Sequence, residues 1–236
     1  MQLFYITGVA GNTCVLGEEE SWHCTRVLRL PEGSPVNLTD GAGNFYEGRL
    51  TKIHHKGCLV EIIKTIHTER RTSFWLHVAM APTKNIERFE WFLEKATEIG
   101  VDEITPLICE HSERKVVKQQ RLEKVLVSAM KQSLKSWLPK LNEAARFRDL
   151  IATPFTGQKF IAWCETGRES ELHDLYRKGS DVLVLIGPEG DYSKAEVDMA
   201  VKNGFIPVSL GESRLRTETA GIVACHVVEM MNKIAK

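Results

Sequence analysis

The sequence Asp181-Val-Leu-Val-Leu-Ile-Gly-Pro-Glu-Gly-Asp-Tyr-Ser-Lys-Ala-Glu196 joins a buried-strand pattern, a glycine turn and a helix start. Its apolar run, Val182–Ile186, predicts a strand that is covered on both faces, as in a parallel sheet. The glycines of the turn let the backbone come close to a ligand. Ser193 and Glu196 form a capping-box pattern, which predicts that a helix begins there. Open α/β sheets bind ligands at the carboxyl ends of their strands, so this turn is a candidate binding loop.

The turn Gly187-Pro-Glu-Gly190 does not match a phosphate loop. It lacks the Walker lysine, and it does not fit the pattern Gly-x-Gly-x-x-Gly. These four residues alone are compatible with a functional loop and with an ordinary tight turn.

A second strand–glycine–helix segment follows near the end of the chain. Phe205–Leu210 reads as a strand, and Gly211 ends it. Thr217 is the predicted N-cap of the next helix, where Glu218 would lie at the positive end of the helix dipole. The apolar face predicted for this helix comprises Ala220, Val223, Val227, Met230 and Ile234.

The two segments together resemble the signature of a known family. Ile186-Gly-Pro-Glu-Gly190 and Leu210-Gly-x-x-x-Leu-Arg-Thr-Glu-Thr-Ala220 are similar to motifs of the RsmE family of SPOUT methyltransferases. The resemblance is strongest at 181–221, fair at 22–30 and 84–101, and weak at 111–160. It implies that S-adenosylmethionine is used to methylate N3 of one uridine in the decoding region of 16S rRNA.

The resemblance also implies a trefoil knot whose loops bind the methyl donor, and a homodimer whose RNA sites draw on both subunits. Asp191 stands where relatives carry a second glycine, and we expect its side chain to point outward. A weaker affinity for the donor is the alternative. The residues implied to line the donor pocket are Ile186, Gly187, Pro188, Glu189, Gly190, Leu210, Gly211, Leu215, Thr219 and Ala220.

Methylation at N3 requires loss of the N3 proton, so a general base or a cation that stabilises the anionic uracil is expected. Arg216 and Glu218 are the nearest polar candidates. We expect Arg216 to act as an electrostatic stabiliser. Glu218 fits a base, or a residue that only stabilises the start of its helix.

Residues 1–70 predict a small β-rich domain. Strand patterns at 3–6, 13–16, 36–39, 44–53 and 58–66 are separated by glycine turns, which favours a small barrel. Trp22–Arg29 resembles the PUA-like RNA-binding domain of the family and keeps His23, Arg26 and Arg29. Leu3 replaces an arginine that relatives carry near the start of the chain.

After a charged connector at 68–72, residues 73–236 predict an α/β domain with a parallel sheet. Strands are expected at 74–80, 101–108, 159–165, 182–186 and 205–210. Helices are expected at 86–99 and at about 118–137.

The formal net charge is zero, but the cations are concentrated. Residues 111–148 contain ten Lys and Arg against three acidic residues, a local net charge of +7. Such a surface is typical of phosphate binding, although a charged helix face is also simply solvated. Lys84 and Arg88 fit RNA contact or an ion-paired helix start. The RNA-binding candidates are His23, Arg26, Arg29, Lys84, Arg88, Arg121, Lys124, Lys131 and Lys135.

No apolar run approaches 18 residues, and the N-terminus lacks a signal-peptide pattern, so we expect a cytoplasmic protein with no membrane contact. The six cysteines are scattered and no histidines have ligand spacing, which argues against a metal site. The expected partners are 16S rRNA, within the small ribosomal subunit, and a second copy of the chain. A Rossmann-like nucleotide enzyme and a non-catalytic RNA-binding module are the alternatives.

Overall fold

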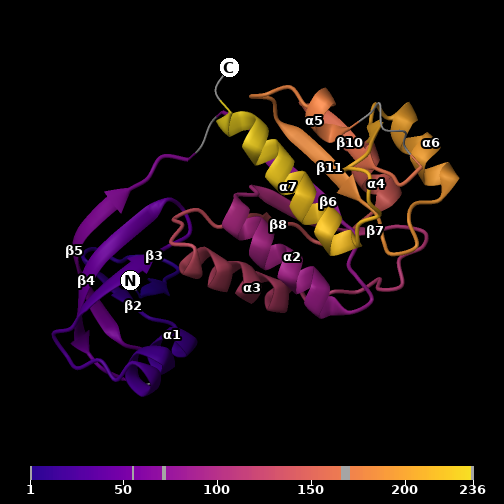
Figure 1. Ribbon diagram of the computed structural model, residues 1–236. Helices are drawn as coiled ribbons and strands as arrows, with labels where there is room; N and C mark the ends of the chain where they lie inside the picture. The colour runs from indigo at the N-terminus through magenta and orange to yellow at the C-terminus, as the bar shows by residue number, and fades with distance from the viewer. Residues whose placement is uncertain (1, 55, 71–72, 166–170, 235–236) are drawn as a thin grey trace. The chain divides into compact units, whose positions relative to one another are not determined.

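The computed structural model describes residues 2–54, 56–70, 73–165 and 171–234, and the chain divides into two compact units (Figure 1). One unit comprises Met1–Arg70 and Val127–Leu138, and the other comprises Arg71–Leu126 and Pro139–Lys236.

The first unit is built on one strongly curled sheet with the strand order β1-β3-β4-β5-β2. The pair β1–β3 is parallel and the other pairs are antiparallel. The pairing of β4 with β5 has two register shifts, and such irregularities bend and twist a strand. The sheet therefore curls into a half-barrel, and the small barrel-like fold expected for this region is confirmed. Its strands are β1 (Leu3–Tyr5), β2 (Thr13–Val15), β3 (Pro35–Thr39), β4 (Asn44–Lys52) and β5 (Leu59–His67).

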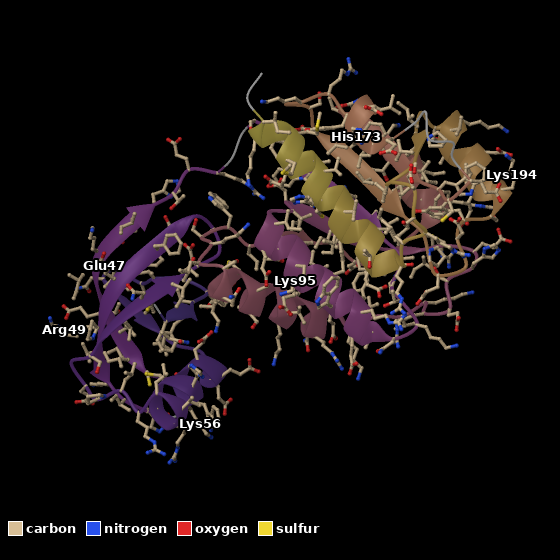
Figure 2. All side chains as sticks on the ribbon, viewed as in Figure 1. Glu47, Arg49, Lys56, Lys95, His173 and Lys194 are labelled. Atoms are coloured by element: carbon tan, nitrogen blue, oxygen red, sulfur yellow. The ribbon has the colours of Figure 1, made fainter. Side chains whose placement is uncertain are left out.

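Strand β4 shows why this sheet has an inner and an outer face. Tyr46, Gly48 and Leu50 are buried, whereas Glu47 and Arg49 between them are exposed. Figure 2 shows the side chains of Glu47 and Arg49 outside the sheet, as the two-residue period of a strand requires. The inner face packs around a cluster that includes Phe4, Ile6, Leu16, Leu38 and Val60. Helix α1 (Glu18–Trp22) and the π-helical turn η1 (His23–Val27) connect β2 to β3.

Helix α3 (Gln119–Gln132) ends five residues earlier than the sequence pattern predicts. Leu134 takes a left-handed conformation with φ 54°, and the Lys135 amide donates to the Met130 carbonyl at 3.0 Å, which ends the helix. Beyond it, Trp137 packs against Gly43, where a Cβ atom would lie 2.4 Å from the indole ring. This tertiary contact holds the segment in the first unit, and it leaves Lys135 outside the helix.

The second unit is built on a parallel sheet with the order β12-β10-β11-β6-β7-β8, and β9 also pairs with β7. Strand β11 pairs with β10 on one side and with β6 on the other, and all five of its residues are buried. The predicted strand that is covered on both faces is thus confirmed. The strands are β6 (Leu76–Met80), β7 (Glu103–Ile108), β8 (Lys140–Leu141), β9 (Ala145–Arg146), β10 (Gln158–Ala162), β11 (Val182–Ile186) and β12 (Ile206–Val208).

Helices cover both faces of this sheet, which makes the unit α/β as predicted. On one face, Leu183 and Leu185 pack with Ile151 of α4 (Phe147–Ala152) and Val197 of α6 (Lys194–Lys202). On the other face, α2 (Ile86–Ile99) and α7 (Thr217–Lys233) lie side by side, and α7 contacts β6 and β11 (Figure 1). The short helix α5 (Leu172–Leu175) contacts α7.

The start and the buried face of α7 differ from the prediction. Arg216, not Thr217, is the N-cap, and its side chain makes no capping hydrogen bond. The buried apolar residues include Gly221, Ala224 and Val228, whereas Met230 of the predicted stripe is 45% exposed. Small residues at the buried positions let α7 approach α2 closely. A pattern search for large apolar residues does not detect a helix face made of small residues.

Candidate functional site

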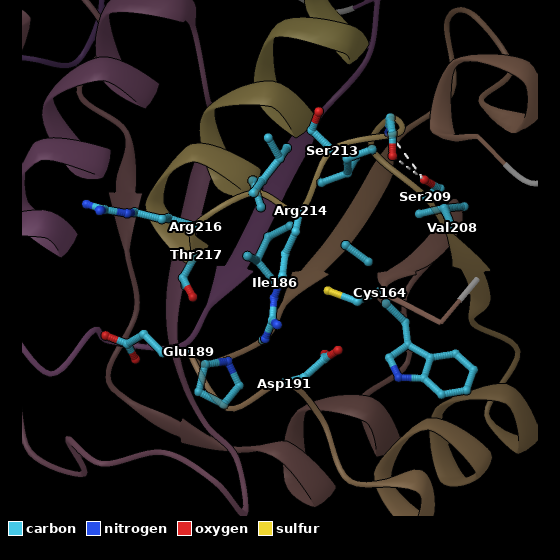
Figure 3. Close-up of a pocket in the computed structure, with 18 of the residues that line it drawn as sticks. Cys164, Ile186, Glu189, Asp191, Val208, Ser209, Ser213, Arg214, Arg216 and Thr217 are labelled. Carbon is cyan, nitrogen blue, oxygen red and sulfur yellow. Dashed lines mark hydrogen bonds between the residues drawn. The ribbon is translucent and has the colours of Figure 1, made fainter. Parts of the chain in front are cut away.

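A cavity of about 740 Å³ lies at the carboxyl ends of β10, β11 and β12 (Figure 3). This is the edge where open α/β sheets bind ligands, and the volume falls within the range of about 300–1,000 Å³ usual for small-molecule sites. Its apolar lining includes Ile186, Val208, Leu210, Leu215 and Ala220.

The loop after β11 is held in place from several directions. A Cβ atom on Gly187 would lie 3.0 Å from the ring of the buried Tyr192, so glycine lets the backbone pass against this ring. Oε1 of Glu189 accepts a hydrogen bond from the Lys84 amide at 2.9 Å. Nδ1 of His111 lies 3.0 Å from the Asp191 carbonyl oxygen, and an acceptor there requires the proton on Nδ1. The loop is therefore a fixed wall of the cavity.

The loop after β12 exposes its backbone to the cavity. The Ser209 hydroxyl donates to the Gly211 carbonyl at 3.0 Å and accepts from the Gly211 amide at 3.2 Å (dashed in Figure 3). Gly211 has φ 119°, a conformation that side-chain-bearing residues rarely adopt, and nothing lies within 4 Å of the place where a Cβ atom would stand. A ligand can thus reach the main chain here.

Most of the residues expected to bind the donor line this cavity. They are Ile186, Gly187, Pro188, Glu189, Leu210, Gly211, Leu215 and Ala220. Two others lie elsewhere: Gly190 packs against His111, and Thr219 lines a neighbouring pocket.

Three charged residues occupy distinct places around the cavity (Figure 3). Arg214 points between Ile186 and Asp191, whereas Arg216 points away from this centre. Asp191 has φ 61° and lines the cavity, so the expectation that its side chain points outward is wrong. Burial raises the pKa of the neighbouring Cys164 thiol, and the Asp191 carboxylate raises it further.

Sequence reasoning missed the contribution of the chain just after β10. The end of that strand and the following residues line the cavity, because parallel strands end at one edge of the sheet. A predicted strand at 159–165 was the signal that could have located them. The missed lining residues at the end of β10 and after it are Ala162, Trp163, Cys164 and Glu165. Those between the end of β12 and the start of α7 are Val208, Ser209, Glu212, Ser213, Arg214 and Thr217.

A second pocket, of about 330 Å³, adjoins the first through Arg88 and Arg216, which line both. Its lining also includes Trp91 and Glu218. The Glu218 side chain is only 10% exposed, and its Oε1 lies 3.9 Å from Nε of Arg88. Its Oε2 is buried and has no hydrogen-bond partner among the described residues. The structure thus brings both catalytic candidates, Arg216 and Glu218, to one pocket.

The RNA-binding candidates differ in their exposure and in their ion pairing. Arg26, Arg29 and Lys124 are exposed, and Nε2 of the half-buried His23 lies 3.1 Å from the Gln2 amide nitrogen. Four others are ion-paired with acids from other parts of the chain: Lys84 with Glu113, Arg88 with Glu218, Arg121 with Glu90 and Lys131 with Glu20. The candidates on α3 are therefore partly neutralised, which sequence periodicity within one helix could not reveal. Lys135 follows the end of α3.

All six cysteines are free, and only Cys164 is exposed. Within the described ranges no cluster of three or more His, Cys, Asp or Glu side chains could hold a metal ion. In the same part of the chain, no helix is long and apolar enough to cross a membrane.

Comparison with known proteins agrees with this architecture. An RNA methyltransferase domain matches residues 70–229, and an RNA methyltransferase PUA domain matches residues 16–63. The chain is therefore of the class of RNA methyltransferases that carry a PUA domain.

Individual relatives narrow the class. Ribosomal RNA small subunit methyltransferase E of Mesomycoplasma hyopneumoniae is 31% identical over 75% of this chain and 78% of its own length. The chain belongs to this family, RsmE, and the resemblance seen in the sequence is confirmed.

Solved structures show the same fold over nearly the whole chain. A probable rRNA-methyltransferase from Porphyromonas gingivalis has a TM-score of 0.90 with 42% identity, and 98% of each chain is covered. Ribosomal RNA small subunit methyltransferase E from Neisseria gonorrhoeae, bound to S-adenosyl methionine, has a TM-score of 0.85 with 27% identity and 95% of each chain covered.

Proposed function

We propose that this protein transfers a methyl group from S-adenosylmethionine to N3 of one uridine in the decoding region of 16S rRNA, within the small ribosomal subunit. Family membership supports methylation of rRNA. The observation that carries the proposal is the cavity at the ends of β10, β11 and β12, because both signature segments line it. The choice of N3 and of the decoding region rests on the resemblance to the family.

The cavity fits the methyl donor, which when bound supplies an electrophilic methyl group on a positively charged sulfonium. Apolar side chains such as Ile186 and Leu215 can pack against the adenine ring, and the open backbone beside Gly211 can hydrogen-bond its edge. The Asp191 carboxylate complements the positive charge of the donor, and the Arg214 guanidinium complements its carboxylate. These residues orient the donor, and orientation supplies much of the rate of a transfer reaction.

Arg216 and Glu218 have separate roles in this proposal. The Arg216 guanidinium stabilises the negative charge that uracil gains as N3 loses its proton. The Glu218 carboxylate accepts that proton, and Arg88 keeps a positive charge beside it. The competing assignment is that Glu218 serves only the positive end of α7.

The two domains have separate roles. Residues 1–70 act as the PUA-like RNA-binding domain, and residues 73–236 as the SPOUT domain, with the donor loops in a trefoil knot. The cations exposed on each unit contact rRNA phosphates, and His23, Arg26 and Arg29 contribute from the first.

The protein works in the cytoplasm as a homodimer. The partly exposed Val223 and Val227 and the exposed Met230 of α7 support such an interface.

The test uses small subunits that lack the modification, large subunits and free 16S rRNA, each incubated with labelled S-adenosylmethionine. Nucleosides from digested RNA are then separated and identified by mass spectrometry. We expect 3-methyluridine from the small subunit and none from the large subunit. A different methylated nucleoside, or label only in the large subunit, would refute the proposed target.

A further inference from the structure

The pocket of about 330 Å³ beside the donor cavity has a composition that suits one nucleobase. A methyl acceptor must approach the donor from a neighbouring site, and this pocket shares Arg88 and Arg216 with the cavity. The inference drawn from it rests on the proposed function, since it names the residues that hold the base.

Trp91 gives the pocket an aromatic surface. It lies on α2 and is 44% exposed, whereas its neighbours Phe89 and Phe92 are fully buried. An exposed indole beside cationic side chains is the usual platform for a base that has left its stack, because every base has an aromatic face. Stacking alone does not select among bases.

The polar groups supply the selection. Uracil presents an acceptor, the N3–H donor and a second acceptor along its Watson–Crick edge. The pocket presents Glu218, an acceptor, together with the guanidinium donors of Arg88 and Arg216. Cytosine has no hydrogen on N3, so it would leave the carboxylate opposite a lone pair.

One oxygen of the Glu218 carboxylate is open to a donor from a ligand. Its Oε2 is buried without a hydrogen-bond partner among the residues described, and its side chain is nine-tenths buried. Leaving such an atom unpaired costs free energy that a donor from the ligand would recover. The N3–H group of uracil is a donor of this kind.

We propose that this pocket is the acceptor-base subsite: Trp91 stacks on the target uracil, Glu218 accepts the N3–H hydrogen bond, and Arg88 and Arg216 donate to the uracil oxygens. Trp91 is thus a substrate-positioning residue for the methylation.

The experiment compares Trp91→Ala, Trp91→Phe and the surface control Val201→Ala, which truncates a side chain 47% exposed on α6. Methylation of small subunits is measured as kcat and KM, donor affinity by calorimetry and folding by thermal melting. From the usual worth of base stacking, we expect Trp91→Ala to lower kcat/KM roughly 5- to 150-fold, with unchanged donor affinity. Trp91→Phe keeps an aromatic face and restores most of the activity, and Val201→Ala matches the wild type.

Three results would overturn the subsite. One is wild-type kcat/KM for Trp91→Ala. Another is a Trp91→Phe protein as impaired as Trp91→Ala. A third is a Trp91→Ala protein that loses activity because it becomes monomeric in sedimentation, since Trp91 would then be an interface residue. Failure of the proposed function is distinguishable from failure of the subsite, because the wild-type protein itself would then form no 3-methyluridine.

Discussion

Gly221 of α7 lies so close to Phe92 of α2 that a Cβ atom on the glycine would be 2.7 Å from Cε2 of the ring. The same atom would lie 2.8 Å from Sδ of Met80 on β6. The helix that follows the loop after β12 is therefore packed onto the sheet and α2 through its backbone. This close packing fixes the start of α7, which carries Arg216 and Glu218.

Gly221→Ala is predicted to destabilise the protein. In an exposed helix this change stabilises by about 0.8–1 kcal/mol. Here the added methyl overpacks a tight contact, and we expect a loss of about 1–3 kcal/mol in the free energy of unfolding. Urea denaturation measures it, with Gly8→Ala as the control, because a Cβ atom there meets nothing within 4 Å. A Gly221→Ala protein at least as stable as the wild type would show that this contact is not tight.

His77 is predicted to make the fold sensitive to mild acid. Burial lowers the pKa of His77 to about 4, and its Nε2 lies 2.8 Å from the Thr105 hydroxyl oxygen. Between pH 6.5 and about 4 the unfolded chain binds a proton that the native state does not, so stability falls as the pH falls. The loss is on the order of 3 kcal/mol across this window.

Replacing His77 with Gln removes this titration. The free energy of unfolding of both proteins is measured by urea denaturation from pH 7 to pH 4. We expect it to fall more for the wild type than for His77→Gln. Parallel pH profiles would mean that His77 is not held neutral by its surroundings.

Asp191 is predicted to strengthen binding of the cationic donor. Asp191→Asn keeps the shape and tolerates φ 61° but removes the charge, whereas Asp191→Gly also relieves the backbone strain. We expect both variants to fold at least as stably as the wild type and to bind S-adenosylmethionine about two- to fivefold more weakly, with a smaller loss for the uncharged thioether product. Calorimetry decides this: equal or tighter donor binding by Asp191→Asn would show that the carboxylate takes no part.

Local signals in the sequence were sufficient for the elements on either side of the loop after β11. The apolar run Val182–Ile186 and the pair Ser193 and Glu196 predicted β11 and the capping box of α6, and both are present. Helix α2 also has its predicted bounds, because Gly100 ends it. Each of these features depends on residues a few positions apart.

Other features depended on contacts that a single segment does not encode. Strands β8 and β9 have two residues each and exist through pairing with β7, so no periodicity marks them. The end of α3 depends on the packing of Trp137 against Gly43. The buried face of α7 depends on how that helix fits against α2. The second pocket was hidden for the same reason, because Trp91 and Glu218 come from helices far apart in the sequence.

The most direct test of the central claim is donor binding by two matched glycine variants. Gly211 lines the cavity and Gly33 lies in the first unit; both have positive φ, 119° and 86°, and open space where a Cβ atom would stand. Gly211→Ala and Gly33→Ala therefore introduce similar backbone strain. If the cavity holds the donor, calorimetry will show wild-type binding of S-adenosylmethionine by Gly33→Ala and at least roughly tenfold weaker binding by Gly211→Ala, a difference of about 1.4 kcal/mol. Equal affinity of the two variants would contradict the assignment of this cavity as the methyl-donor site.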